Sequence, residues 1–366
     1  MANTSDWNEE KETTTANIDD LAFIKSVDAA DMLGLVLDMP EHIKTGIETG
    51  KKVKLPAGRK IQNILVTGLG GSAIGGDVLR CFLSKRCSVP ITVNRNYHIP
   101  AYVGENTLVF AISYSGGTEE TLSACKEALE KNALVIAVTS GGKIKELVSS
   151  AGGIVVEVPG GFSPRAALGH LFFPLALIVS RLGLAEIPGA ELEETVKVLL
   201  KLRENFKPET AVSENLAKQL ANKLFAKAVI VYGSADFTEV VANRWKCQLA
   251  ENSKVFAMHS VIPEMNHNEI VGWDLLRKVL RKFAVIFIRD KQDDPKVQKR
   301  MDITKAMLGK RANWAGEVNS IGESPLARLF SLIYLGDFTS VYLSLLYGID
   351  PTPIEAINHF KEELAK

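Results

Sequence analysis

The sequence IQNILVTGLGGSAIGGDVLRCFLSKR, residues 61–86, sets the architecture of the chain. Its first part is an apolar run that predicts a buried strand, and residues 68–76 form a glycine-rich stretch typical of a tight loop. Residues 77–86 carry apolar side chains at helical spacing. A strand that enters a helix through a glycine turn is the repeating unit of parallel α/β sheets.

The same pattern continues along the chain on both sides of a polar helical segment. Further strands are predicted at residues 89–94, 107–113 and 133–139, with a helix at residues 119–132. A segment rich in charges, residues 186–226, reads as linker helices, and the alternation then restarts with a strand at 227–233. We therefore predict two doubly wound parallel-sheet α/β domains with a helical linker and C-terminal helices.

The predicted boundaries follow from these changes of pattern. Residues 1–20 are polar and predict a disordered tail. The first domain, with N-terminal helices, covers 21–185, the helical linker 186–226, and the second domain, with the C-terminal helices, 227–366. Val66-Thr67-Gly68 and Val231-Tyr232-Gly233 each end an apolar strand before a helix, so the two domains look related.

The composition argues against several classes of partner. The 366 residues hold 43 basic and 43 acidic side chains, so no global field favours nucleic acid or an anionic membrane. The four cysteines form no CxxC pair, which argues against a zinc site and for a reduced, cytoplasmic protein. The apolar stretch at residues 171–179 is interrupted by Pro174 and is too short to span a bilayer.

The first glycine-rich loop, residues 68–76, favours an anion because glycines leave backbone N–H groups uncovered at a helix N-terminus. Gly68, Gly70 and Ala73 also fit a relaxed dinucleotide fingerprint, so an NADP-dependent oxidoreductase is an open alternative. The acidic residue that would bind a ribose is replaced by Asn94-Arg95, which suits at best a 2′-phosphate. A tight turn without a ligand is the third interpretation.

The second loop, Ser113-Tyr114-Ser115-Gly116-Gly117-Thr118, favours a small terminal phosphate. It offers three hydroxyl-bearing serine and threonine side chains and two glycines ahead of a predicted helix. A simpler interpretation makes Thr118 the N-cap of that helix, but capping leaves Ser113 and Ser115 unexplained.

Five blocks of sequence, taken together, point to a family. They are GLGGSAIGGDV, ISYSGGTEET, SPRAALG, QLAENSK and PEMNHNEIVGW. In this order they resemble the bifunctional phosphoglucose/phosphomannose isomerases, which are built from two sugar isomerase (SIS) domains. The resemblance runs from about residue 20 to the C-terminus. It implies reversible conversion of glucose 6-phosphate and mannose 6-phosphate to fructose 6-phosphate through an enediol, without metal or organic cofactor.

The resemblance also implies roles for single residues. The phosphate and substrate ligands would be Gly70, Gly71, Ser72, Ser113, Ser115 and Thr118. Arg165 would steady the enediolate and Glu251 would be the base. His267 would open the sugar ring, with assistance from Lys361, and Thr352 would influence substrate specificity. The family further implies a homodimer in which His267 reaches the site of the neighbouring subunit.

The chemistry asks for the same residue types. Isomerisation needs a group that removes a proton from C2 and returns it to C1, which a carboxylate can do if it titrates near neutrality. Taken alone, Glu251 would be a solvated acid at a helix end, paired with Lys254, and His267 would be an ordinary loop residue. Arg165 would be a residue at a helix start, or else a stabiliser of negative charge.

A non-catalytic SIS-domain regulator that senses a sugar phosphate is the main alternative function. Such a protein would keep the hydroxyls of the phosphate loops but would not need Glu251, His267 and Arg165. All three stand in the matching blocks, which disfavours the regulator.

Overall fold

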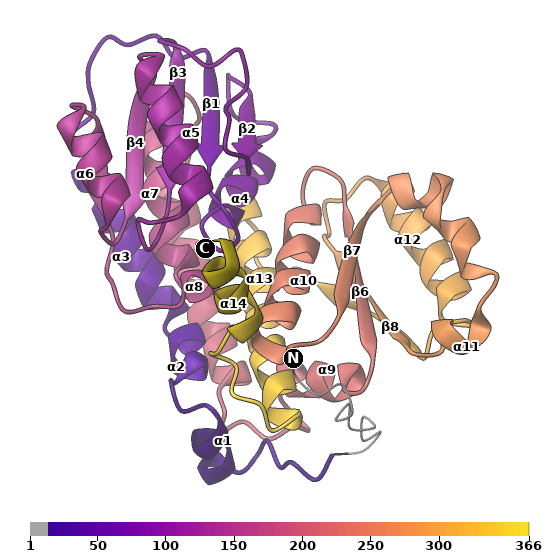
Figure 1. Ribbon diagram of the computed structural model, residues 1–366. Coiled ribbons are helices and arrows are strands. Elements are labelled where there is room, and N and C mark those ends of the chain that lie inside the picture. Colours follow the sequence, from indigo (N-terminus) through magenta and orange to yellow (C-terminus); the bar gives the residue numbers. More distant parts are fainter. Residues whose placement is uncertain (1–13, 365) are drawn as a thin grey trace.

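The computed structural model describes residues 14–364 and 366. Two parallel sheets form separate lobes, and helices from the middle and the end of the chain lie between them (Figure 1). This arrangement confirms the predicted fold class of two parallel-sheet α/β domains.

The first sheet has five parallel strands in the order β2-β1-β3-β4-β5. The strands are β1 (Asn63–Thr67), β2 (Ile91–Asn94), β3 (Thr107–Ile112), β4 (Leu134–Thr139) and β5 (Ile154–Glu157). Side chains alternate between the two faces of a strand. Ile64 and Val66 therefore face α3 (Met39–Lys52), α4 (Ile74–Leu83) and α7 (Leu168–Arg181), whereas Leu65 faces α5 (Glu119–Glu130) and α6 (Lys143–Ser150).

Glycines let α3 and α7 approach closely. A Cβ atom on Gly46 would lie 2.4 Å from the carbonyl oxygen of Gly169, and one on Gly169 would lie 2.8 Å from the Cβ of His42. Any larger side chain at either position would push the two helices apart.

The second sheet has four parallel strands in the order β7-β6-β8-β9. They are β6 (Ala228–Ser234), β7 (Ala257–Ile262), β8 (Phe283–Arg289) and β9 (Trp314–Asn319). Its inner face packs on α10 (Glu239–Ser253) and α13 (Pro325–Leu346). Its outer face is covered by α12 (Pro295–Leu308) and by the short 3-10 helices η2 (Glu264–His267) and η3 (Glu269–Trp273).

Helix α13 is the central helix of the molecule. Every one of its residues from Leu326 to Leu346 is buried. By length and composition it could cross a membrane, but its apolar stretch is entirely buried inside the fold. The segment predicted as a linker supplies α8 (Gly189–Phe206) and α9 (Leu216–Leu224), and both pack against α13.

The remaining helices lie at the two ends of the chain, in the first domain, and, for α11 (Arg277–Leu280), in the second domain beside α12 (Figure 1). The others are α1 (Leu21–Val27), α2 (Met32–Leu37), the 3-10 helix η1 (Pro164–Ala166) and α14 (Glu355–Leu364).

The predicted disordered tail of residues 1–20 is too long at its C-terminal end. Residues 1–13 lie outside the described residues. From residue 14 onward the chain is held against the body, because Thr14 donates its hydroxyl to the Leu346 carbonyl and Ile18 is buried. Asp19 accepts a hydrogen bond of 2.8 Å from Lys218. These contacts are long-range, so the polar composition of the segment does not reveal them.

Candidate active site

Two loops of the first domain lie side by side at the carboxyl end of its sheet. One follows β1 and contains Gly70, Gly71 and Ser72, and the other follows β3 and runs from Ser113 to Thr118. The chain leaves β1 toward β2 and then returns to the other side as β3, so these loops flank the point where the strand order reverses. Open α/β sheets bind ligands at this point.

The two loops are joined by hydrogen bonds. Ser72 is buried, and its Oγ accepts the Tyr114 N–H at 3.2 Å. The Tyr114 hydroxyl donates to the Pro159 carbonyl and accepts the Phe162 N–H. Ser72 and Tyr114 therefore link both loops to the segment that leads to Arg165.

The hydroxyls of the second loop divide into two kinds. Ser113 is fully buried and donates to Thr118 Oγ1 at 2.9 Å, while the Thr118 N–H donates to Ser113 Oγ. Thr118 occupies the N-cap position of α5 but makes no side-chain cap, so the simple capping interpretation is wrong. Ser115 is exposed at the tip of the loop and remains accessible to a ligand.

A third loop, which contains Gly141 and Gly142, packs against the second loop. Gly116 has φ +71°, and a Cβ there would meet the Gly141 carbonyl oxygen at 1.8 Å. Gly142 in turn approaches the Ser115 carbonyl. Only glycine combines this backbone conformation with this proximity, so the spacing of the glycines shapes the loop that presents Ser115.

Arg165, in η1, connects the first domain to the second. A Cβ on Gly71 would lie 2.8 Å from the Arg165 backbone nitrogen, so the first glycine loop packs directly on the arginine segment. The Arg165 guanidinium donates from Nε to Asn252 Oδ1 at 2.6 Å and from Nη2 to the Pro351 and Thr352 carbonyls, each at 2.9 Å. Its Nη1 lies 3.7 Å from Glu251 Oε2.

The electrostatics of this junction centre on a buried cation. Arg165 is 3% exposed, and burial lowers its pKa while the carboxylates of Glu251 and Asp350 oppose that shift. A guanidinium stays protonated at any physiological pH, so a positive charge is held in a partly dry environment. Such a charge can stabilise an oxyanion strongly.

The pairing of Glu251 with Lys254 that the sequence suggested does not form. Lys254 instead donates its ammonium to backbone carbonyls, including those of Glu251 and Pro351. Burial, reinforced by Arg165, lowers the pKa of Lys254. The carboxylate of Glu251 is therefore directed at Arg165 rather than at the helix-end lysine.

A cleft of about 590 Å³ opens beside Glu251. It runs from the end of α10 to the start of α14. Its wall is completed by Asp350, Pro353, Ile354 and Glu355. Thr352 lies in the sequence between Asp350 and Pro353 but is not one of the residues that line the cleft, and its Oγ1 is buried without a hydrogen-bond partner among the described residues.

His267 lies elsewhere on the same chain. It is exposed at the end of η2, which packs on the outer face of the second sheet through Met265. Glu251 is on α10, on the inner face of that sheet. The two residues also flank opposite ends of β7, whose six residues span roughly 20 Å.

Lys361 is also exposed, on α14. This helix has no buried residue. Its first turn, which includes Glu355 and Ile357, lines the cleft next to Glu251. The structure therefore brings the start of α14 to the site, while Lys361 lies further along the helix.

A set of buried polar residues behind Arg165 was not predicted from the sequence. Arg244, Gln248 and Asn252 are spaced by four along α10 and face Asp337 and Ser340 of α13. The signal was present, since polar residues every four positions on a helix form one stripe. That stripe is buried only because α13 covers it.

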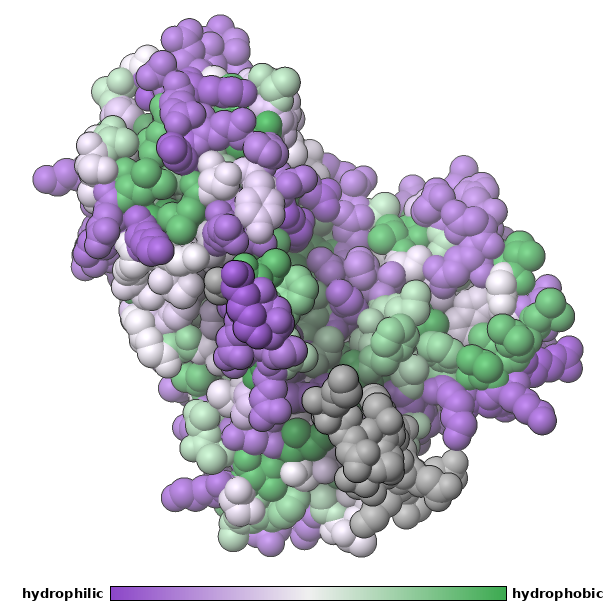
Figure 2. Space-filling model, viewed as in Figure 1, coloured by the Kyte–Doolittle hydropathy of each residue, from purple (hydrophilic) through white to green (hydrophobic). Residues whose placement is uncertain are grey.

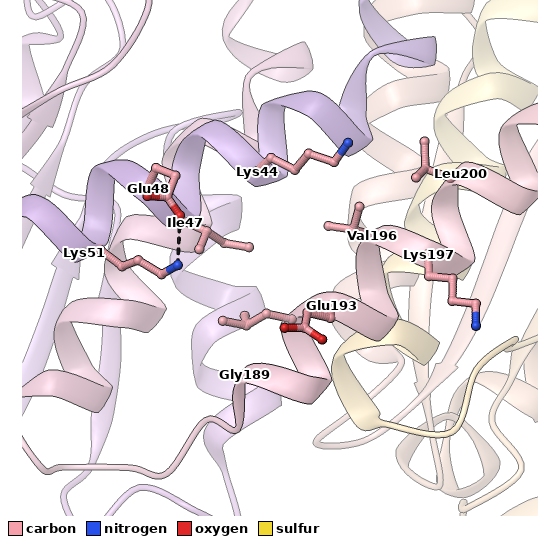
Figure 3. A pocket seen from close by; sticks show the side chains of 10 residues that line it. Lys44, Ile47, Glu48, Lys51, Gly189, Glu193, Val196, Lys197 and Leu200 are labelled. Atoms are coloured by element: carbon pink, nitrogen blue, oxygen red, sulfur yellow. Dashed lines mark hydrogen bonds and ion pairs between the residues drawn. The ribbon is translucent and has the colours of Figure 1, made fainter.

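Another hollow, of about 450 Å³, lies between α3 and α8 and contains none of the predicted site residues (Figure 3). Its floor is apolar, formed by Ile47, Leu192 and Val196. Lysine and glutamate side chains rim it, and Lys51 pairs with Glu48 there.

Family profiles match both domains. Residues 213–364 match the profile described as "Bacterial phospho-glucose isomerase C-terminal SIS domain", and residues 59–145 match the SIS domain profile.

Whole-chain relatives agree with these matches. The chain is 47% identical to a bifunctional phosphoglucose/phosphomannose isomerase of Caldicellulosiruptor bescii, over 92% of this chain and 99% of that protein. It is 37% identical to a protein of the same name from Aquifex aeolicus, over 83% and 91% of the two chains. A glucose-6-phosphate isomerase-like protein of Thermus thermophilus has the same fold, with a TM-score of 0.64, 21% identity, and coverage of 92% and 98%.

Proposed function

This chain belongs to the bifunctional phosphoglucose/phosphomannose isomerase family, and we propose that it interconverts glucose 6-phosphate, mannose 6-phosphate and fructose 6-phosphate. One observation carries the proposal. A buried guanidinium and a carboxylate, 3.7 Å apart, lie directly behind a pair of hydroxyl- and glycine-rich loops. Phosphate recognition and proton transfer therefore meet at one junction.

The proposed reaction moves one proton between two carbons. The phosphate of the open-chain sugar binds the loops that carry Ser72 and Ser115. Glu251 removes the C2 proton, the C–H electrons form the C1–C2 double bond, and negative charge develops on O1. Arg165 donates from Nη1 to that oxygen. The proton on O2 then passes to O1, the electrons on O2 form the C2=O2 bond as the C1–C2 double bond opens, and Glu251 returns its proton to C1, which yields the ketose.

Two substrates follow from one base. Glucose 6-phosphate and mannose 6-phosphate differ only in the configuration at C2. A site that tolerates rotation about the C2–C3 bond lets the Glu251 carboxylate reach the C2 proton of either sugar. Thr352, whose carbonyl accepts from Arg165 and whose Oγ1 is unpaired among the described residues, is the residue we assign to this tolerance.

Ring opening is assigned to His267, assisted by Lys361. Because His267 and Glu251 lie on opposite faces of the second sheet, we propose that His267 acts in the site of a second subunit. The segment around His267 also exposes apolar side chains, as Figure 2 shows near α11. They are Val271, Leu275, Leu276 and Val279. A two-fold homodimer would cover this surface and complete two identical sites.

The alternatives have less support. A non-catalytic regulator would not need a carboxylate beside Arg165, and the named relatives are isomerases. For the NADP-dependent alternative, the residue at the end of β2 that would meet a 2′-phosphate, Arg95, instead pairs with Asp77. All four cysteines are free thiols, which fits the cytoplasmic location we propose.

A coupled assay on both hexose phosphates, with and without EDTA, tests the activity. We expect turnover of both sugars at similar rates, unaffected by the chelator. An absorbance titration with NADPH serves as the control for the oxidoreductase alternative. Failure to convert either sugar, or loss of activity on metal removal, would contradict the proposal.

Mixing two inactive variants tests the shared site. In a mixed dimer of Glu251→Gln and His267→Ala chains, one site carries both defects and the other is native. After co-refolding, about a quarter of native activity should return if pairing is random. No recovery would mean that both residues act within one chain, and sedimentation as a monomer at assay concentration would exclude the shared site directly.

A further inference from the structure

The guanidinium of Arg165 has a defined set of donors, and most are used by the protein. Nε donates to Asn252 and Nη2 donates to the Pro351 and Thr352 carbonyls. Nη1 is the nitrogen that lies near Glu251, at 3.7 Å from Oε2, and the described residues give it no hydrogen bond. A guanidinium is a rigid plane, so fixing one edge fixes the direction of the other.

Asn252 is the side chain that fixes this edge. It is fully buried, its Oδ1 accepts from Arg165, and its Nδ2 donates to Ser340 Oγ at 2.9 Å. The Ser340 hydroxyl then donates to the Asp337 carbonyl. Because Arg165 can only donate, the Asn252 amide can take only one orientation, and every bond in this chain has a defined direction.

A second contact holds the backbone of Arg165. Arg244 forms a two-point ion pair with Asp337, with bonds of 3.0 and 2.6 Å, and its Nη2 also donates to the Arg165 carbonyl at 2.9 Å. Arg244 and Asn252 lie two turns apart on one stripe of α10, the helix that also carries Glu251. One rigid helix thus sets the position of the base and of the cation that faces it.

We propose that Asn252 is a positioning residue for the isomerase reaction: it holds the Arg165 guanidinium so that Nη1 is presented to Glu251 and to the oxygen of the intermediate. Asn252 is fully buried, so it would act through Arg165 and not through contact with the substrate. The inference rests on the proposed function and assigns part of its rate to a residue that acts through Arg165.

Asn252→Ala tests the assignment, with Ser253→Ala as the matched control. Ser253 is the next residue, is equally buried, and also bonds to Ser340, but through the Ser340 carbonyl and without contact to Arg165. We expect kcat of Asn252→Ala to fall on the order of 10- to 100-fold with KM changed less than about threefold, because a displaced group loses rate rather than phosphate binding. Ser253→Ala should keep kcat within about twofold while its Tm falls comparably.

Asn252→Asp supplies a readout that a merely structural role would not move. The new carboxylate still accepts from Nε, but it adds a buried negative charge beside Glu251 and disfavours the ionised form of that base. The acid limb of the kcat/KM profile should shift to higher pH. Asn252→Asp also tests the positioning role if Asn252→Ala fails to fold.

The outcomes distinguish failure of the proposed isomerase function from failure of the positioning role of Asn252. Wild-type protein that isomerises neither sugar phosphate overturns the proposed function. If the wild-type protein is active, the positioning role is overturned when Asn252→Ala has the same kcat and KM as Ser253→Ala. It is also overturned when the acid limb of the kcat/KM profile of Asn252→Asp lies at the same pH as in the wild type. Neither result contradicts the isomerase function.

Discussion

Both sheets reverse their strand order at their first strand, but the loops at this point carry different side chains in the two domains. In the first domain β1 lies between β2 and β3, and in the second β6 lies between β7 and β8. The first-domain loops, residues 68–76 and 113–118, contain no charged side chain. They offer backbone N–H groups, glycines and hydroxyls to whatever binds there.

The second domain fills the equivalent position with its own carboxylates. Asp293, from the loop after β8, accepts from the Ser234 hydroxyl at 2.6 Å and from the Asp290 N–H at 3.1 Å. Asp290 is itself buried against Arg328, with 2.8 Å between Oδ2 and Nε. Donors that could receive a phosphate are therefore already satisfied within the chain.

The comparison shows how one architecture can serve two purposes. In the proposed function, the first domain keeps its switch point for the ligand, and the second contributes from the opposite end of its strands, where the last turn of α10 carries Glu251 and Asn252. We expect the first domain to control affinity for the phosphate and the second to control the rate of proton transfer.

The largest expected effect is on the rate. Glu251→Gln removes the base and leaves the phosphate loops intact, so kcat should fall on the order of 10²–10⁴-fold with little change in ligand affinity. In deuterated water the wild type should incorporate deuterium at C1 or C2, and the variant should not. Near-native turnover by Glu251→Gln would contradict the assignment of proton transfer to the second domain.

A smaller effect, on binding, is expected from the first domain. Ser115→Ala deletes the exposed hydroxyl at the loop tip, and a hydrogen bond to a charged group contributes about 1.5–3 kcal/mol. KM for fructose 6-phosphate should rise roughly tenfold or more, while kcat changes little. Ser253→Ala is a control outside the phosphate loops. A fall in the kcat of Ser115→Ala at constant KM would contradict the expectation that the first domain controls phosphate affinity.

The stability of the first domain should depend on pH through a buried histidine pair. His42 and His170 contact each other with ring centroids 4.7 Å apart, and both rings also contact Phe162, in the segment that leads to Arg165. Burial, aided by His42, lowers the pKa of His170 to about 4. The unfolded chain takes up this proton near pH 6.5, so stability is full above that pH and is lost as pH falls toward 4.

Removing His170 should flatten this dependence. We expect His170→Leu to abolish roughly 2 kcal/mol of the stability loss that the wild type shows between pH 6.5 and 5. Urea unfolding at several pH values measures it, with His98→Ala as the control because His98 is exposed. Parallel curves for wild type and His170→Leu would show that the buried pair does not titrate as described.

The smallest effect on activity is expected at the filled position of the second domain. Burial raises the pKa of Asp293. Stability therefore falls as pH rises from the ordinary aspartate pKa of 3.8 to the raised pKa of the folded state, the cost is fully present above the raised pKa, and it disappears in acid, where both states are protonated. Asp293→Asn should raise Tm at neutral pH and keep kcat and KM within about twofold.

Inorganic phosphate provides the sharper contrast between the two domains. It should raise the Tm of wild type and of Asp293→Asn equally, and the Tm of Ser115→Ala less. Loss of phosphate stabilisation in Asp293→Asn alone would assign the anion site to the second domain.

Much of this protein was predictable from local pattern. Apolar runs before glycine loops identified both domains, because strand and helix periodicity are short-range properties of a chain. The loops that carry Gly71, Ser72 and Ser115 could be located for a similar reason, since a loop between a strand and a helix is identified by residues close in sequence, and their role in binding stays a prediction. The length of the N-terminal tail was misjudged, because Ile18 and Asp19 are ordered only by distant partners.

The junction that we propose to be catalytic was decided by tertiary packing. Arg165 and Asn252 are separated by 87 positions, yet they share a 2.6 Å hydrogen bond because α10 and η1 meet where the two domains join. Glu251 faces Arg165 rather than Lys254 for the same reason. Burial turns the polar stripe of α10 into a supporting frame, and only the packing of α13 over that stripe supplies the burial.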